Sequence, residues 1–173
     1  MKKFMPDMYQ KSILDISYNK LKEKGIKLLL FDLDNTLIEK ERKNPDEKII
    51  NKLNELKKDF KVLIVSNTIK KPKIMEFYNA CKIDYIMFSR KPLKFGFKKV
   101  KKLNLAKASE TIMIGDQILT DILGAKRMGY FSALIDPIGT DDVSVTKINR
   151  KIENYILKKL KEKYSFEKGK YYE

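Results

Sequence analysis

Short apolar runs alternate with longer amphipathic segments along this chain, and this alternation is the feature that most restricts its fold. The runs expected to be buried strands are 26–32, 62–67, 85–88, 111–116 and 130–135. Strands that alternate with helices pair in parallel, because a right-handed helical crossover returns the chain to the same edge of the sheet. The sequence therefore predicts an α/β fold with a doubly wound parallel sheet in three layers, α/β/α.

Helices are expected between and around these strands. Their predicted ranges are 9–24, the segment that follows Pro45, 71–81, 95–103, 118–128 and 146–164. The first has apolar residues at mixed helical spacing and ends at Gly25, a favourable C-terminal cap. The last is amphipathic and rich in lysine. A chain of 173 residues with 43% hydrophobic residues and no repeat or linker predicts one domain over 1–173.

Composition excludes several kinds of catalysis. The chain has no histidine and one cysteine, so Ser-His-Asp and Cys-His mechanisms, imidazole zinc sites and internal disulfides are excluded. The formal net charge of +15 favours anionic partners, namely nucleic acid, an anionic membrane or phosphorylated substrates, without choosing among them. No apolar stretch approaches the length of a membrane span, and charges interrupt the N-terminal MKKFMPDMYQK, so a cytoplasmic location is expected.

Polar side chains follow the predicted strands. Asp32 and Asp34 come directly after the first strand, where two nearby carboxylates repel each other unless a cation or a reaction compensates. The later strand ends carry Ser66, Asn67 and Thr68, then Lys91, then Asp116 and Asp121. In a doubly wound sheet these ends share one edge, where ligands bind. An all-oxygen acidic cluster suits Mg²⁺. The sequence therefore predicts a magnesium site at which a phosphate group reacts.

The order of these segments carries a family resemblance. DLDNT (32–36), SNT (66–68), Lys91 in RKP and GDQILTD (115–121) resemble the four motifs of the haloacid dehalogenase (HAD) phosphatase superfamily. The flanks FMPDMYQKSILDI and TKINRKIENYILKKL make the chain similar to the YqeG-type, class IIIA phosphatases and to the mitochondrial phosphatidylglycerophosphatase group. The resemblance implies an HAD-like Rossmannoid fold.

The resemblance also implies roles for these residues. Asp32 would attack phosphorus and form an aspartyl-phosphate, and Asp34 would be the general acid and base. Ser66, Asn67 and Lys91 would bind the phosphoryl oxygens. The magnesium ligands would be the Asp32 carboxylate, the Asp34 backbone carbonyl and Asp116, with Asp121 as a further ligand or a support for the others.

Some of these roles have structural alternatives. The segment 66–68 could be only a turn or a helix cap, and Lys94 could replace Lys91. Asp121 could be a surface acid favoured by a helix dipole. Thr36 is expected to be a structural turn residue, and Asp141 and Asp142 are assigned no role in the site.

Three classes of function follow. The favoured one is a Mg²⁺-dependent phosphatase acting on a phospholipid head group such as phosphatidylglycerophosphate. The segments between the strands leave no room for a cap domain, so the open site suits a phosphate presented by a bilayer or a macromolecule. The basic helix at 147–163 would then contact an anionic leaflet at the inner face of the membrane. The alternatives are a phosphatase for nucleic-acid ends or another cytosolic phosphomonoester, and a non-catalytic binding protein. The sequence does not indicate an oligomeric state.

Overall fold

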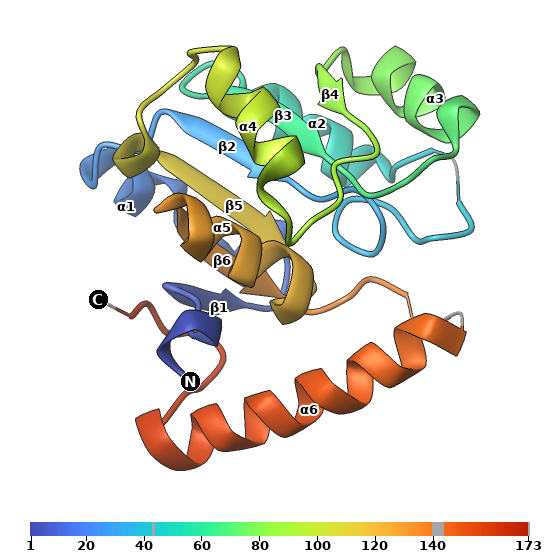
Figure 1. Cartoon of the computed structure of the whole chain (residues 1–173). Helices are drawn as coiled ribbons and strands as arrows, with labels where there is room; N and C mark the ends of the chain where they lie inside the picture. The colour runs from blue at the N-terminus through green and yellow to red at the C-terminus, as the bar shows by residue number, and fades with distance from the viewer. Residues whose placement is uncertain (43, 140–143, 173) are drawn as a thin grey trace.

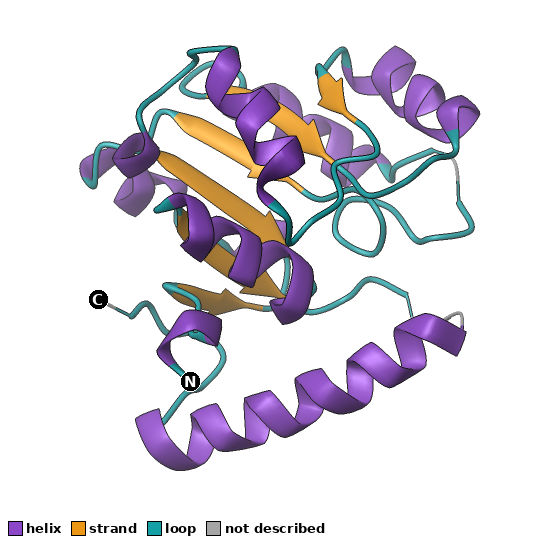
Figure 2. Cartoon of the chain, in the orientation of Figure 1, coloured by secondary structure: helices purple, strands orange, loops and turns teal. Residues whose placement is uncertain are grey.

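The computed structural model of the chain describes residues 1–42, 44–139 and 144–172, and it contains a six-stranded, wholly parallel sheet. The strand order is β1-β6-β5-β2-β3-β4 (Figures 1 and 2). The strands are β1 (Met8–Gln10), β2 (Leu28–Phe31), β3 (Lys61–Val65), β4 (Tyr85–Ile86), β5 (Thr111–Gly115) and β6 (Phe131–Ile135). All five predicted strands are present, so the predicted parallel α/β sheet is confirmed.

Helices cover both faces of the sheet, which confirms the three-layer prediction. They are α1 (Tyr18–Glu23), α2 (Glu47–Leu56), α3 (Lys71–Cys81), α4 (Lys94–Lys102), α5 (Leu123–Met128) and α6 (Ser144–Tyr164), with one-turn segments η1 (Lys2–Phe4), η2 (Ile13–Asp15), η3 (Ala108–Glu110) and η4 (Ile118–Ile122). Alternate residues of β2 point to opposite layers. Leu29 and Phe31 lie in the cluster formed with α1, α2 and α3, whereas Leu28 and Leu30 lie in the cluster formed with α4 and α5.

The prediction of a helix over 9–24 is wrong. This segment contains strand β1, the 3-10 turn η2 and the short helix α1. Strand β1 pairs with the otherwise open edge of β6, and the Asp7 carboxylate reinforces this pairing by accepting hydrogen bonds from the backbone N–H and hydroxyl of Ser132, both at 2.8 Å. The Ser12 hydroxyl caps η2 by accepting a hydrogen bond from the backbone N–H of Leu14. Tertiary pairing and local capping therefore outweigh the helical spacing of the apolar residues.

The C-terminal helix has the predicted extent, since α6 spans Ser144–Tyr164. Ile156 and Leu160 are buried in a cluster with Leu134 and Phe166, whereas Ile152 and Tyr155 are exposed. The apolar face expected for this helix is thus only partly packed on the body of the protein. The side chain of Ile148 on the same helix lies outside the described part of the chain, as do Asp141 and Asp142.

Two features of the fold leave the strand ends open. Between β2 and β3 the described residues form a loop and α2, and between β3 and β5 they form α3, β4, α4 and η3. Within the described ranges no domain is inserted at either place, which confirms the predicted absence of a cap. None of the described helices is both long enough and apolar enough to span a bilayer.

Candidate active site

A cavity of about 360 Å³ opens at the carboxyl ends of β2 and β3. The predicted site residues that line it are Asp32, Asp34, Ser66, Asn67 and Lys91. Further lining comes from Lys40 and Lys70 and from Gln117 and Thr120. The parallel sheet therefore brings all four predicted motifs to one cavity, the fourth through Gln117 and Thr120, whereas Asp116 and Asp121 do not line it.

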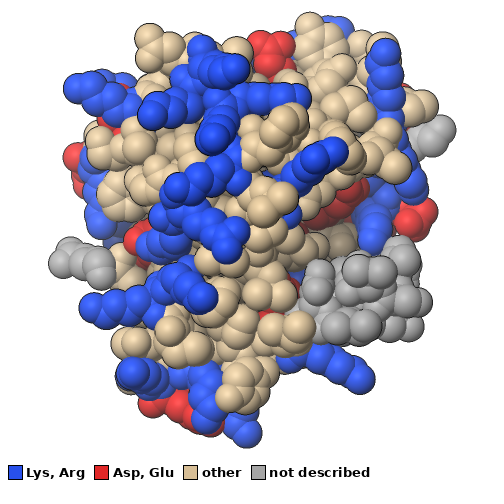
Figure 3. Space-filling model, viewed as in Figure 1, with Lys and Arg blue, Asp and Glu red and all other residues tan. Residues whose placement is uncertain are grey.

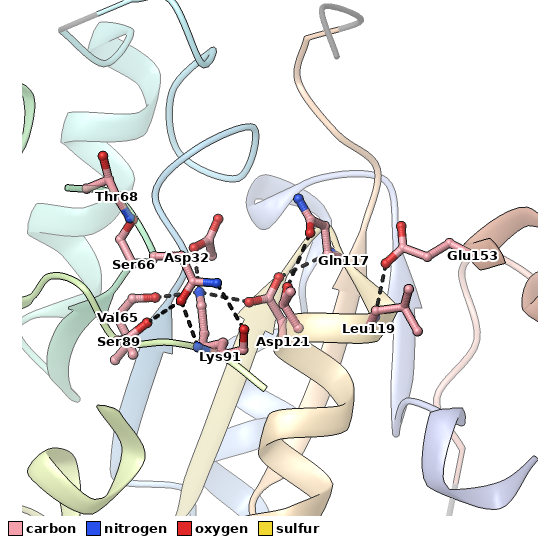
Figure 4. Close-up of polar contacts among 12 residues, drawn as sticks. Asp32, Val65, Ser66, Thr68, Ser89, Lys91, Gln117, Leu119, Asp121 and Glu153 are labelled. Carbon is pink, nitrogen blue, oxygen red and sulfur yellow. Dashed lines mark hydrogen bonds and ion pairs between the residues drawn. The ribbon is translucent and has the colours of Figure 1, made fainter. Parts of the chain in front are cut away.

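A buried ion-pair network joins Asp32 to Asp121 through Lys91 (Figure 4). The Nζ atom of Lys91 lies 2.5 Å from Oδ1 of Asp32, 2.8 Å from Oδ1 of Asp121 and 2.5 Å from the backbone carbonyl oxygen of Val65. Burial lowers the pKa of Lys91, but the two carboxylates raise it by more, so the net shift is upward and the lysine stays charged. Burial raises the pKa of Asp32, and Lys91 opposes this effect. The network thus supplies a fixed positive charge beside the predicted nucleophile.

Asp116 adds a third buried carboxylate to this edge. Its Oδ2 atom lies 2.6 Å from Nη2 of Arg150 on α6, whereas its Oδ1 atom is buried without a hydrogen-bond partner among the described residues. Burial and the nearby Asp121 raise the pKa of Asp116 to about 6. A buried carboxylate oxygen without a donor is costly unless something else binds it.

The three acids are close enough to share one ion. One carboxylate oxygen from each of Asp32, Asp116 and Asp121 lies within 4.8 Å of the others. The donors are all oxygen, as hard divalent cations prefer, and the unpartnered Oδ1 of Asp116 offers a ligand position. Both oxygens of Asp121 face other groups, because Oδ1 forms an ion pair with Lys91 at 2.8 Å, although without a hydrogen bond among the described residues, and Oδ2 accepts the backbone N–H of Gln117 at 3.1 Å. These contacts fit a supporting role for Asp121 better than direct ligation.

Asp34 lies outside this acidic cluster. Its carboxylate forms an ion pair with Nζ of Lys73, whose side chain is buried at the start of α3. The same ammonium group donates to the backbone carbonyl oxygens of Lys40 at 2.6 Å and Glu39 at 3.4 Å. Lys73 therefore ties Asp34 to the loop that follows it. The sequence analysis missed Lys73, although its place beside Ile74 and Phe77 on the buried side of α3 is a detectable signal.

Asn67 positions the loop that carries Lys91. Its Oδ1 atom accepts hydrogen bonds from the hydroxyl of Ser89 at 2.8 Å and from the backbone N–H of Lys91 at 2.7 Å. Its Nδ2 atom donates to the carbonyl oxygen of Lys91 at 3.0 Å. Phosphate binding by Asn67 stays a prediction, but these three bonds show that its side chain fixes the backbone of Lys91.

Three further observations bear on the roles predicted from the sequence. Ser66 is buried and its hydroxyl accepts the backbone N–H of Thr68 at 3.0 Å, so it forms a local turn while also lining the cavity. Lys94 is exposed at the start of α4, whereas Lys91 is buried among the carboxylates. The geometry therefore favours Lys91 over Lys94. Thr36 is buried, and its role as a structural turn residue stays a prediction.

Helix α6 also contributes to the site, through residues that the sequence analysis did not assign. Glu153 accepts the backbone N–H of Leu119 at 3.0 Å and lies 3.4 Å from Nη1 of Arg150. Burial is the main reason why the pKa of Glu153 is raised to about 7. Helical spacing shows that positions 150 and 153 share a face, but only the packed structure shows that this face meets Asp116 and η4.

Comparisons with known proteins agree with this geometry. Residues 1–87 match the family model described as mitochondrial PGP phosphatase, and residues 88–162 match the model described as HAD-hydrolase-like. A probable phosphatase, YqeG, from Bacillus subtilis (strain 168) is 38% identical over 161 residues, which cover 92% of this chain and 93% of that protein.

Solved structures share the fold at low sequence identity. A predicted HAD-like family hydrolase from Porphyromonas gingivalis has a TM-score of 0.55 and 14% identity, with 73% of this chain and 98% of that chain covered. A HAD family enzyme from Bacteroides thetaiotaomicron, in complex with magnesium and inorganic phosphate, has a TM-score of 0.52 and 16% identity, with coverages of 70% and 99%.

Proposed function

We propose that this chain hydrolyses a phosphomonoester through Asp32 with Mg²⁺ as its cofactor. The chain belongs to the HAD-like phosphatases and resembles the PGP phosphatase group. The observation that carries the proposal is the placement of Asp32 in one cavity with Asp34 and Lys91, beside the buried Asp116. A bound Mg²⁺ would supply positive charge that lets an anionic nucleophile approach a phosphate. Asp32 and Asp116 would hold it, with the backbone carbonyl of Asp34 as a further ligand and Asp121 as the support.

The chain's own residues would divide the reaction into two displacements. In the first, the free oxygen of Asp32 forms a bond to phosphorus while the ester P–O bond breaks, and Asp34 gives its proton to the departing alkoxide. In the second, Asp34 takes a proton from water as that water attacks phosphorus, and the bond to Asp32 breaks. The net reaction converts a phosphomonoester and water into an alcohol and inorganic phosphate.

Two cavity groups would stabilise the charge that moves in both steps. Lys91 is a fixed ammonium held by Asp32, Asp121 and the carbonyl of Val65, so it needs no reorganisation during the reaction. The Ser66 hydroxyl lines the same cavity and would donate to a phosphoryl oxygen. Phosphate binding by both residues is part of the proposal.

We further propose that the substrate is a phospholipid head group, with phosphatidylglycerophosphate as the leading candidate. The family model for residues 1–87 supports this choice, and so does the uncapped cavity, which a large substrate can cover. A protein that closes no cap over its site can accept a phosphate that stays attached to a bilayer.

The test compares substrates and one matched pair of variants. Phosphate release is measured from phosphatidylglycerophosphate, nucleotide monophosphates and phosphate-ended oligonucleotides, with Mg²⁺ and with a chelator. Asp32→Asn should abolish turnover and phosphoenzyme formation, whereas Asp59→Asn, a control at an exposed carboxylate paired with Lys22, should change neither. Undiminished hydrolysis by Asp32→Asn would refute the covalent mechanism, and a higher rate on oligonucleotide ends would refute the lipid assignment.

A further inference from the structure

Four large apolar side chains are exposed beside the cavity. The exposed fractions are 71% for Ile69, 44% for Phe88, 57% for Leu93 and 46% for Phe95. Ile69 follows the second motif and also lines the cavity, while the other three flank the loop that carries Lys91. With the exposed basic residues Lys70, Arg90 and Lys94, these four form a surface that we call the rim.

Several members of the rim are joined by direct contacts. The guanidinium of Arg90 lies 4.6 Å from the ring centre of Phe88 and 5.5 Å from that of Phe95. The backbone N–H of Leu93 donates to the carbonyl oxygen of Arg90 at 2.8 Å, and that of Phe88 donates to the carbonyl oxygen of Thr68 at 3.1 Å. These bonds place the segment with Ile69 and Lys70 beside the loop that carries the other rim residues.

The loop at 88–91 presents alternate residues to the outside and to the site. Phe88 and Arg90 are exposed, while Ser89 and Lys91 are buried. Both exposed residues adopt left-handed backbone conformations, with φ of 50° for Phe88 and 55° for Arg90. Left-handed backbone is unfavourable for side chains such as these, and such strain is concentrated at functional sites. The same loop therefore fixes the proposed catalytic lysine and turns an aromatic ring outward.

The exposed charged side chains of the two rim segments are basic, namely Lys70, Lys71, Arg90 and Lys94. Residues 60–75 and 85–109 include no acidic residue, and two of their lysines, Lys73 and Lys91, are buried and paired with Asp34 and Asp32. Figure 3 shows basic side chains gathered over the part of this face formed by α4. A surface that combines exposed apolar side chains with unopposed positive charge fits a partner that is apolar below an anionic layer.

We infer that the rim docks the protein on an anionic lipid bilayer, so that a lipid phosphate enters the cavity directly from the head-group layer. This inference rests on the proposed function, because it assigns the surface that would present the lipid substrate. Ile69, Phe88, Leu93 and Phe95 reach into the head-group boundary, and Lys70, Arg90 and Lys94 contact lipid phosphates. Helix α6 lies toward the other edge of the sheet from α3 (Figure 1), and the inference assigns docking to the rim rather than to the exposed apolar residues of α6.

The test uses vesicles of phosphatidylcholine with and without phosphatidylglycerol, measured by co-sedimentation at low and high salt. The rim variant is Leu93→Ser with Phe95→Ser. Neither residue lines the cavity, and Leu93 occupies the N-cap of α4, where serine is favourable. The matched control is Ile152→Ser with Tyr155→Ser on α6, which removes two side chains of similar exposure, 45% and 61%.

Wild-type protein should bind only the vesicles with phosphatidylglycerol, and binding should weaken at high salt. The rim variant should bind them about tenfold more weakly, since two half-exposed apolar side chains no longer enter the interface. The α6 variant should bind like wild type. Equal binding by the rim variant, or lost binding by the α6 variant, would overturn the inference. So would a rim-dependent binding of oligonucleotide in place of vesicles.

A second measurement separates this inference from the proposed function. Both double variants and wild type are assayed on p-nitrophenyl phosphate, which needs no bilayer. If the inference holds, the rim variant keeps the wild-type rate on this substrate and loses rate on phosphatidylglycerophosphate in vesicles. Wild-type protein that hydrolyses p-nitrophenyl phosphate but ignores anionic vesicles refutes the docking surface alone, whereas vesicle binding without any phosphatase activity refutes the proposed function alone.

Discussion

Replacing Lys73 with methionine tests whether a buried cation positions the proposed general acid. Lys73→Met keeps most of the side-chain volume and removes the ammonium that pairs with Asp34 and donates to the carbonyls of Lys40 and Glu39. Asp34 would then lose its fixed orientation toward the cavity. We expect the variant to fold and to lose activity chiefly in the proton-transfer role of Asp34.

The structure sets the size of both effects. Breaking a fully buried ion pair costs about 3–5 kcal/mol, but the Asp34 side chain is 27% exposed and water can reach it. The loss of stability should therefore be about 1–3 kcal/mol, the cost of leaving one or two buried groups without a partner. General acid catalysis contributes roughly 10²–10⁴-fold, so a misplaced Asp34 should lower kcat by about 10²-fold.

The assay compares leaving groups, because a purely structural role for Lys73 would not depend on them. An alkyl phosphate needs its leaving alkoxide protonated, whereas p-nitrophenolate leaves readily without a proton. Lys73→Met should therefore slow the alkyl phosphate more than p-nitrophenyl phosphate, with KM little changed. Lys71→Met, at an exposed position of the same helix, is the control and should match wild type.

A double-mutant cycle completes the test. If Lys73 acts through Asp34, adding Lys73→Met to Asp34→Asn should cause little further loss of kcat, since the residue that it positions is already disabled. An equal loss on both leaving groups, or fully additive effects of the two substitutions, would refute the positioning role.

Three further predictions concern the other acids and their partners. Asp116→Asn should weaken Mg²⁺ binding by at least about tenfold, so that part of the lost rate returns at high Mg²⁺; a deficit insensitive to Mg²⁺ would exclude Asp116 as a ligand. Asn67→Ala should lower kcat/KM roughly tenfold, because the three hydrogen bonds that hold Lys91 and Ser89 are lost. An unchanged kcat/KM would show that the loop keeps its conformation without Asn67. Glu153→Gln should stabilise the protein at high pH. Its folded pKa of about 7 lies above the ordinary 4.5, so the wild type loses up to about 3 kcal/mol relative to the variant as pH rises through this interval. Urea unfolding in a chelator at pH 4 and pH 8 measures the difference, which should be absent at pH 4.

The central strands were predictable because their burial is encoded locally. Strands β2 and β5 are buried on both faces, so β2 reads as an unbroken apolar run and β5 departs from one only at Thr111, a pattern that no amphipathic helix would show. The edge strand β1 has no such signal. It is three residues long, and only its pairing with β6 and the contacts of Asp7 with Ser132 determine its structure. A pairing between residues more than a hundred positions apart cannot be read from local periodicity.

The acids of the candidate site were predictable for a related reason. Each follows an apolar strand, and the parallel topology alone brings the strand ends together. The cations that pair with these acids were harder to predict. Lys73 and Arg150 come from helices whose orientation depends on packing. Helical spacing places Lys73 on the buried side of α3, but it does not show which of the 38 lysines and arginines pairs with which acid.

These pairings explain how several carboxylates, two of them buried, coexist at one edge. Asp32, Asp34 and Asp116 each face a different cation, namely Lys91 from the loop after β4, Lys73 from α3 and Arg150 from α6. Each cation occupies one oxygen of its carboxylate, as the Oδ2 of Asp116 shows, while the Oδ1 of the same residue stays buried without a donor.

We expect that a divalent ion would bind this edge without breaking the pair between Arg150 and Asp116, because Arg150 would hold one oxygen of Asp116 while the other oxygen binds the metal. At Asp32, the oxygen paired with Lys91 would also serve the metal, which leaves the other oxygen free to attack phosphorus. The fixed cations thus reduce repulsion among the acids, and a bound metal would add positive charge when the phosphate enters. On this basis Arg150→Met should weaken Mg²⁺ binding, because Asp116 loses the cation that holds it. If Mg²⁺ alone relieves the repulsion among the acids, Arg150 only competes with the metal, and the variant should bind Mg²⁺ more tightly. Isothermal titration of Mg²⁺ into the wild type and this variant distinguishes the two directions.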